Sequence, residues 1–279
     1  MAAIGMPPVV LAPTFKALLK EAQFTQEMLG AGATQIRKAN YASKGLYFQA
    51  FTSLATGLER IGKLCLLLDC YLSSGRFPDD DYLRTEIGHK LKLLYARSQN
   101  VIARHSIEIE YKQDLSDPIL QAIIQVLHDF ALGDRYSNID MVIRNPRSSD
   151  PVIAWYKTVD IPLYESMVTD AKKQKIAHNA AAVAALIGQH SMVLHTSEIG
   201  EEITDIEQAS QRTGMFEAVA PHRQLRVLQI IRYWVELLRA LQWKVYFRNG
   251  GDIPCFGEIF AIFNNDDSYF RTRKTWISP

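Results

Sequence analysis

Residues 43–74 read SKGLYFQAFTSLATGLERIGKLCLLLDCYLSS and give the strongest helical signal in the chain. Their apolar side chains recur at alternating intervals of four and three residues, which places them along one face of an α-helix. That face consists of Tyr47, Phe51, Leu54, Leu58, Ile61, Cys65, Leu68 and Leu72. Because residues 64–67 extend the apolar surface around the circumference, we expect a helix covered on all sides, at the centre of a bundle or in a subunit interface. Gly75 is expected to end it.

Further helices are predicted on both sides of this stretch. They are expected at residues 14–29 with Thr14 as N-cap, from Pro78 to a turn at Gly88-His89, and at 90–105, 118–132, 176–195 and 221–242, with another opening at Asp160. The helix at 118–132 is the best defined, because Ser116 or Asp117 can cap it and Gly133 can end it. The alanine-rich run 176–195 is expected to allow close helix packing. Residues 133–152 are predicted to be a polar loop. The acidic, irregular residues 197–215 are predicted to be a linker or an excursion from the bundle.

The composition changes to a β-type pattern after residue 242. Short strands are predicted at 243–248, 256–263 and 269–277, with 264–267 as a hairpin turn. The expected fold class is therefore mainly α: a helical bundle with additional helices and a small C-terminal antiparallel β-hairpin or sheet. We expect three parts, namely an N-terminal helix and linker (1–40), the bundle (41–196), and a long helix with the hairpin region packed on the bundle (197–279).

Composition limits the classes of function. The 279 residues include 31 Lys and Arg against 30 Asp and Glu, so no overall field draws the chain to nucleic acid or to an anionic membrane. Any polyanion site must therefore be local. Apolar residues at 48% and charged residues at 22% are globular values. Cys65 and Cys70 lie in an apolar helix and are expected to be reduced, and without a signal peptide or a long apolar run the chain is expected to be cytoplasmic.

Three short constellations of polar residues stand out, while common enzyme signatures are missing. The sequence has no G-x-S-x-G, no Gly-Lys-Ser/Thr phosphate loop, no H-E-x-x-H and no C-x-x-C. The constellations are Glu59-x-x-x-Lys63, Gly88-His89-x-Leu91 and Arg135-Tyr136-x-Asn138-x-Asp140.

In this order the three motifs resemble the HEPN superfamily, whose helical bundles occur in bacterial toxin–antitoxin, abortive-infection and RNA-processing systems. The resemblance covers about residues 40–150. It implies a HEPN-like bundle and an RNA- or nucleotide-handling function. It further implies a metal-independent ribonuclease that acts as the effector of a phage-defence or toxin–antitoxin system.

The chemistry of the side chains suggests a role for each constellation. His89 is a candidate general base for a ribose 2′-hydroxyl, which RNA cleavage without a metal requires. Arg135 offers a forked donor for phosphate, and Tyr136 offers a ring on which a base can stack. We therefore predict catalytic roles for His89, Arg135 and Arg84, RNA or phosphate binding by Tyr136, Asn138, Arg144, Asn145 and Arg147, and positioning roles for Glu59, Lys63 and Asp140.

The chain departs from the family in one respect. HEPN ribonucleases carry an arginine followed after four to six residues by a histidine, typically on the last helix of the bundle. The match in this chain is Arg84-Thr-Glu-Ile-Gly-His89, which lies early. A late copy begins at Arg144-Asn145 but continues with Pro146, and no histidine follows before His178. A catalytic site would therefore be a rearranged one.

Each constellation also has a structural interpretation. Glu59 and Lys63 can form a solvated i, i+4 pair worth about 0.3–0.5 kcal/mol, or a partly buried pair in which Glu59 positions a neighbouring histidine. His89 can cap a turn, and Arg135 can pair with Asp140. The chain would then be a non-catalytic HEPN-like protein that acts through dimerisation or partner binding, or an unrelated helical protein.

No metal and no cofactor are expected. His190 and His195 are five residues apart, which does not place both rings on one helical face. The expected partners are a second copy of the chain, an RNA or nucleotide, and a protein such as an antitoxin, but not a membrane. Two further basic groups follow. The first is predicted to be a solvated helix face and consists of His222, Arg223, Arg226, Arg232 and Arg239. The second is either a basic patch or a set of edge-strand charges that deter strand pairing, and consists of Arg271, Arg273 and Lys274.

Overall fold

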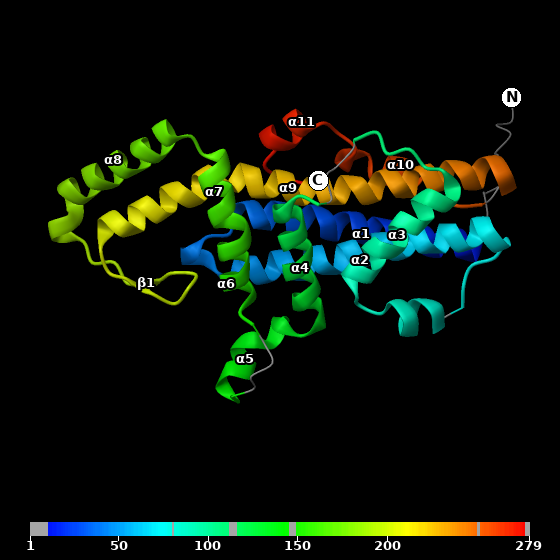
Figure 1. Ribbon diagram of the computed structural model, residues 1–279, viewed down its shortest axis with the longest axis horizontal. Helices are drawn as coiled ribbons and strands as arrows, with labels where there is room; N and C mark the ends of the chain where they lie inside the picture. Colours follow the sequence, from blue (N-terminus) through cyan, green and yellow to red (C-terminus); the bar gives the residue numbers. More distant parts are fainter. Residues whose placement is uncertain (1–10, 80, 112–115, 145–148, 250–251, 277–279) are drawn as a thin grey trace, which may run out of the picture.

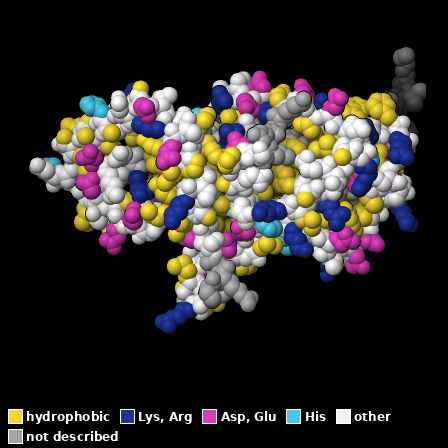
Figure 2. All heavy atoms as spheres, viewed as in Figure 1, with side chains coloured by type: hydrophobic (Ala, Val, Ile, Leu, Met, Phe, Trp, Pro, Cys, Tyr) yellow, Lys and Arg dark blue, Asp and Glu magenta, His cyan; other side chains and the backbone are white. Residues whose placement is uncertain are grey.

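Three long helices run side by side along the molecule and form its body (Figure 1). They are α1 (Pro13–Lys38), α2 (Gly45–Ser74) and α9 (Ile206–Asn249). The computed structural model describes residues 11–79, 81–111, 116–144, 149–249 and 252–276. Acidic and basic side chains are interspersed over the face seen in Figure 2.

The prediction of a central helix at residues 43–74 is confirmed by α2. All eight residues of its apolar face are buried, as are Leu64 and Leu66, which flank that face. Neighbours surround it, because α1, α9, α3 (Leu91–His105) and α4 (Pro118–Leu132) all contact it. Gly75 ends the helix with φ of 76° and donates its N–H to the carbonyl of Tyr71, as a left-handed C-terminal residue does.

α1 is longer than the predicted helix at 14–29 and continues through Gly30 and Gly32. Glycine lies inside the helix here because α2 packs so closely that a larger residue would not fit. A Cβ atom on Gly32 would lie 2.6 Å from Cγ of Leu54, and one on Gly57 would lie 2.7 Å from Cδ2 of Leu29. The two glycines therefore form a reciprocal notch in which each helix receives a leucine of the other.

The helices that surround the body begin and end largely as predicted. Asp117 caps α4 by accepting the N–H groups of Ile119 and Leu120, and Gly133 follows its last turn. α3 covers the predicted helix at 90–105. Before it lie a π-helical segment, η2 (Tyr82–Ile87), and Gly88 with φ of 54°.

Residues 133–152 are more helical than the predicted loop. They include η3 (Asp134–Tyr136) and α5 (Ser137–Val142), and Pro151 opens α6 (Pro151–Trp155) behind an Asp150 cap. From α6 the chain continues through η4 (Tyr156–Asp160) into α7 (Ile161–Met167). Asp160 therefore does not start a helix as predicted. It lies inside a continuous helical run, with its carboxylate buried against Tyr47, Trp155 and Arg223.

The alanine-rich run forms α8 (Asp170–Ile187), which is followed by η5 (Gly188–His190). Most of its side chains are exposed, so close packing explains only the part near Ile176 and Ala180. The predicted acidic linker at 197–215 is wrong, because it contains the hairpin and the first turns of α9. α9 begins at Ile206 and holds Pro221 in its interior rather than at its start.

A small antiparallel sheet accompanies the mainly helical fold, as predicted, but its position differs. Its strands are β1 (His195–Thr196) and β2 (Glu202–Ile203). The predicted C-terminal strands are wrong. Residues 243–248 belong to α9, and α10 (Phe256–Ile259), η6 (Ala261–Phe263) and α11 (Asp267–Thr272) replace the hairpin. The rings of Phe256, Phe260 and Phe263 recur at helical spacing and are buried, which favours helical turns over strands.

The basic residues of α9 do not form the predicted solvated face. Arg223 is fully buried and Arg232 nearly so. Arg232 is paired with Asp267 at 2.9 Å and lies over the ring of Tyr111 at 4.2 Å. Arg271, Arg273 and Lys274 lie in and after α11 and not on an edge strand. Within the described residues, no helix has the length and apolarity needed to cross a membrane.

Candidate functional site

A pocket of about 220 Å³ lies where α2, α4 and the turn before α3 meet. Three of the residues singled out in the sequence line it, although they are far apart in the chain: Glu59, His89 and Arg135. The remaining lining residues are Thr52, Ala55, Thr56 and Arg60 of α2, and Phe130 and Ala131 of α4.

Two neighbouring side chains hold the carboxylate of Glu59 in the pocket. One carboxylate oxygen accepts from Nζ of Lys63 at 2.7 Å, and the other lies 2.8 Å from Nδ1 of His89. The Glu59 side chain is only 13% exposed, so the pair with Lys63 is not the solvated pair of an isolated helix. Burial with two partners fixes the carboxylate, and it is therefore positioned to orient the imidazole.

His89 reaches this carboxylate because of the turn that precedes α3. Gly88 adopts a left-handed φ of 54°, which reverses the chain after η2. When the neutral ring donates its Nδ1 proton to Glu59, the opposite nitrogen, Nε2, is left as a proton acceptor. The side chain is 64% exposed, so that acceptor is accessible to a ligand.

Arg135 enters from the other side of the pocket, on η3 just after α4. Its guanidinium donates to the backbone carbonyl of Ala131 and lies 5.9 Å from the centre of the Tyr136 ring. The residue is exposed, so it remains available to a ligand. A planar fork of this kind is suited to a phosphate group.

Arg60 is a pocket residue that the sequence motifs do not indicate. It follows Glu59 directly on α2, and its guanidinium donates to both carboxylate oxygens of Glu21 on α1 at 2.8 Å. Only the helix α1 packed beside α2 gives Arg60 this orientation. In the sequence, only its position next to Glu59 indicated that Arg60 could line the pocket.

The other predicted site residues do not line the pocket. Arg84 is exposed on η2, and Tyr136, Asn138 and Arg144 are exposed on or beside α5. Asp140 is half-buried on α5, and Lys63 acts one turn away through Glu59. Asn145 and Arg147 lie outside the described residues. The structure thus brings together Glu59, Lys63, His89 and Arg135.

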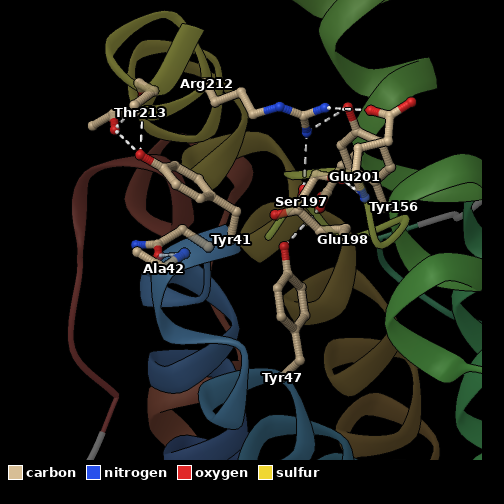
Figure 3. Close-up of polar contacts among 12 residues, drawn as sticks. Tyr41, Ala42, Tyr47, Tyr156, Ser197, Glu198, Glu201, Arg212 and Thr213 are labelled. Atoms are coloured by element: carbon tan, nitrogen blue, oxygen red, sulfur yellow. Dashed lines mark hydrogen bonds and ion pairs between the residues drawn. The ribbon is translucent and has the colours of Figure 1, made fainter. Parts of the chain in front are cut away.

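A second polar cluster fastens the hairpin to the body. Arg212 of α9 points toward Glu198, Glu201 and Tyr156 (Figure 3). It is 3.1 Å from the Glu198 carboxylate, whose side chain is fully buried, and burial raises the pKa of Glu198. Tyr41 donates its hydroxyl to the carbonyl of Ala209 nearby. These contacts hold elements together, since every one of them joins the hairpin, η4 or η1 (Tyr41–Ser43) to α9.

The described part of the chain contains no group of three or more His, Cys, Asp or Glu side chains that could hold a metal ion. His195 instead contacts the ring of Tyr41 edge-on, with centroids 5.5 Å apart. Comparison of the chain with protein-family models, with curated proteins and with solved structures gave no match. The likeness to HEPN proteins therefore rests on the three ordered motifs.

Proposed function

We propose that this chain is a HEPN-like RNA- or nucleotide-handling protein and, more specifically, a metal-independent endoribonuclease that acts as the effector of a bacterial defence or toxin–antitoxin system. One observation carries the proposal. Glu59 on α2, His89 in the turn before α3 and Arg135 on η3 line a single pocket. A carboxylate, an imidazole and a guanidinium in one place supply the groups that cleavage of a phosphodiester needs without a metal.

The proposed reaction uses the ribose 2′-hydroxyl as its nucleophile. Nε2 of His89 takes the hydroxyl proton while the 2′-oxygen bonds to phosphorus. The bond from phosphorus to the 5′-oxygen then breaks, and that oxygen takes a proton from water. Arg135 stabilises the negative charge on the phosphate, and Glu59 holds the imidazole through Nδ1. The products are a 2′,3′-cyclic phosphate and a free 5′-hydroxyl.

The test is RNA cleavage by the purified full chain in the presence of EDTA. We expect cleavage with cyclic phosphate ends, and a loss of about 100-fold or more in His89→Ala and Arg135→Ala, the size typical of a lost acid–base or charge-stabilising group. His178→Ala serves as the control, because His178 is exposed on α8. Equal rates in all four proteins, or no cleavage by any of them, would contradict the proposal that the chain is a ribonuclease.

A second function is favoured by one specific surface. Ile139, Met141, Val142 and Ile143 on and after α5 are all strongly exposed, and Val142 reaches 82%. α5 projects from the body directly after the Arg135 segment (Figure 1). A cluster of exposed large apolar side chains is typical of an interaction surface. On this alternative the chain acts without catalysis, by forming a homodimer through α5 or by binding a protein such as an antitoxin.

A further inference from the structure

A second and larger cavity, of about 710 Å³, lies where α1 ends beside the middle of α9. It shares no lining residue with the pocket that contains His89. Its walls come from the end of α1, from η1, from α9 and from the segment after α11. This volume is in the range of pockets that hold small organic ligands. We refer to it as the α1–α9 cavity.

Positive charge predominates in the wall of the α1–α9 cavity. Arg37, Lys38, Arg223 and Lys274 line it, against the single carboxylate of Glu217. The charge of Arg223 is balanced by Asp160 at 3.2 Å. In the described part of the chain, Arg37, Lys38 and Lys274 form no ion pair with a carboxylate. Two positive charges therefore remain in excess.

The excess of positive charge in the cavity wall affects Arg37. Its guanidinium donates to the neutral side-chain oxygen of Gln224 at 2.7 Å. Burial and the neighbouring Arg223 cation lower the pKa of Arg37. A charged group is thus held where its charge is poorly compensated, and an anion in the cavity would stabilise it.

The cavity is built on a fixed frame. The Arg223 guanidinium donates to Asp160, to the hydroxyl of Tyr47, and to the carbonyls of Arg37 and Ala39 at the end of α1. These bonds fix the end of α1 and the backbone that carries Arg37 and Lys38. The Nε of Arg223 is buried and has no hydrogen-bond partner within the described residues. The rings of Tyr41 and Phe216, with centroids 6.2 Å apart, supply an apolar part of the wall.

We propose that the α1–α9 cavity binds a small molecule that carries a phosphate monoester, with the phosphate among Arg37, Lys38 and Lys274 and the organic part against Tyr41 and Phe216. The excess of two positive charges matches the dianionic state of such a group at neutral pH. A basic guanidinium and two ammonium groups are the donors that proteins commonly use for phosphate. The concave, partly apolar wall favours a small molecule over a polynucleotide.

The proposal is tested by calorimetric titration of the full chain at low salt with inorganic phosphate, adenosine, AMP and a single-stranded RNA oligonucleotide. We expect AMP to bind, inorganic phosphate to bind more weakly, and adenosine not to bind. Lys38→Gln and Lys274→Gln change exposed side chains, and we expect the double variant to bind AMP at least 10-fold more weakly while melting at the same temperature as the wild type.

Two controls separate this site from the proposed active site. Lys175→Gln changes an exposed lysine on α8, and His89→Ala changes the other pocket; both are expected to bind AMP as the wild type does. The proposal is overturned if AMP does not bind, if the double variant binds normally, if His89→Ala abolishes binding, or if only the RNA oligonucleotide binds. Loss of RNA cleavage in His89→Ala with AMP binding retained would support both sites independently.

Discussion

Arg223 and Asp160 form the most deeply buried ion pair among the described residues, and both side chains are fully inaccessible to solvent. Burial raises the pKa of Asp160, although Arg223 and the hydrogen bonds from Tyr47 and Trp155 act in the opposite direction. The pair joins α7's helical run to α9 and, through Arg223, to the end of α1. Removing one partner would leave the other charge buried alone, which typically costs about 3–5 kcal/mol.

The sequence could not reveal this pair. Arg223 lies beside other basic residues on α9, and within that helix it resembles a member of a solvated stripe. Its burial is decided by Asp160, which lies 63 residues earlier on another element. By contrast, Glu59 and Lys63 are neighbours on one helix, so their contact follows from helical spacing alone. The Glu59–Lys63 contact could thus be predicted from the sequence, whereas the Arg223–Asp160 pair could not.

His222, next to Arg223, makes stability depend on pH. Burial, together with the nearby Arg271 and Arg226 cations, lowers the pKa of His222, and its Nδ1 is buried with no partner in the described residues. The unfolded chain therefore takes up a proton near pH 6.5 before the folded chain does. The stability contribution of the neutral ring is present above that pH and is lost as the pH falls below it.

We expect the free energy of unfolding, measured with urea, to fall less between pH 7.5 and 5.5 in His222→Gln than in the wild type. His178→Gln, on the exposed face of α8, is the matched control and should fall as the wild type does. Identical pH profiles for His222→Gln and the wild type would show that His222 does not contribute to the acid sensitivity.

At the scale of elements, the contact between α1 and α2 depends on two glycines. A Cβ atom on Gly57 would also lie 3.3 Å from the backbone nitrogen of Leu29, and one on Gly32 would lie 3.1 Å from that of Leu54. Backbone atoms cannot move aside as a side chain can. Substitution must therefore displace the facing leucine side chain and shift the facing backbone locally by a few tenths of an ångström.

We expect Gly57→Ala and Gly32→Ala each to lower the free energy of unfolding by about 1–3 kcal/mol, because overpacking outweighs the gain in helix propensity of about 1 kcal/mol. Gly45→Ala is the matched control, since a Cβ atom there has nothing within 4 Å. Chemical denaturation of the three variants checks this. An unchanged or increased stability in Gly57→Ala would mean that the helices are not in close contact there.

Sequence patterns predict some helix ends correctly and others wrongly. Asp117 and Gly133 bound α4 as predicted, because capping is a local interaction. Pro221 resembles a helix start yet lies inside α9, and the aromatic residues after 242 resemble strands yet form helical turns. In both cases burial against other helices outweighs the local preference. The proximity of Glu59, His89 and Arg135 depends on how the helices pack. It could therefore be stated from the sequence only as a hypothesis.

At the scale of the whole molecule, α5 is the element that departs most from a compact outline (Figure 1). If two copies associate through it, replacing Val142 with a charged residue should separate them. We expect light scattering after size-exclusion chromatography to give a dimer for the wild type and a monomer for Val142→Asp.

Leu186→Asp, at an equally exposed apolar side chain on α8, should remain dimeric. A monomeric wild type would contradict self-association through α5 and leave α5 as a surface for a different protein. Dissociation by Leu186→Asp instead of Val142→Asp would place the interface on α8.

The bond from the backbone N–H of Trp276 to the hydroxyl of Thr34 spans 242 residues, and the Trp276 ring is completely enclosed. A ribosome adds roughly 5–20 residues per second, so about 10–50 seconds separate the synthesis of these two contacts. During that interval α1 and α2 have emerged without α9 and the C-terminal turns that cover them. The newly made chain therefore exposes the apolar faces of α1 and α2 during this interval. We expect molecular chaperones to bind these faces and prevent aggregation.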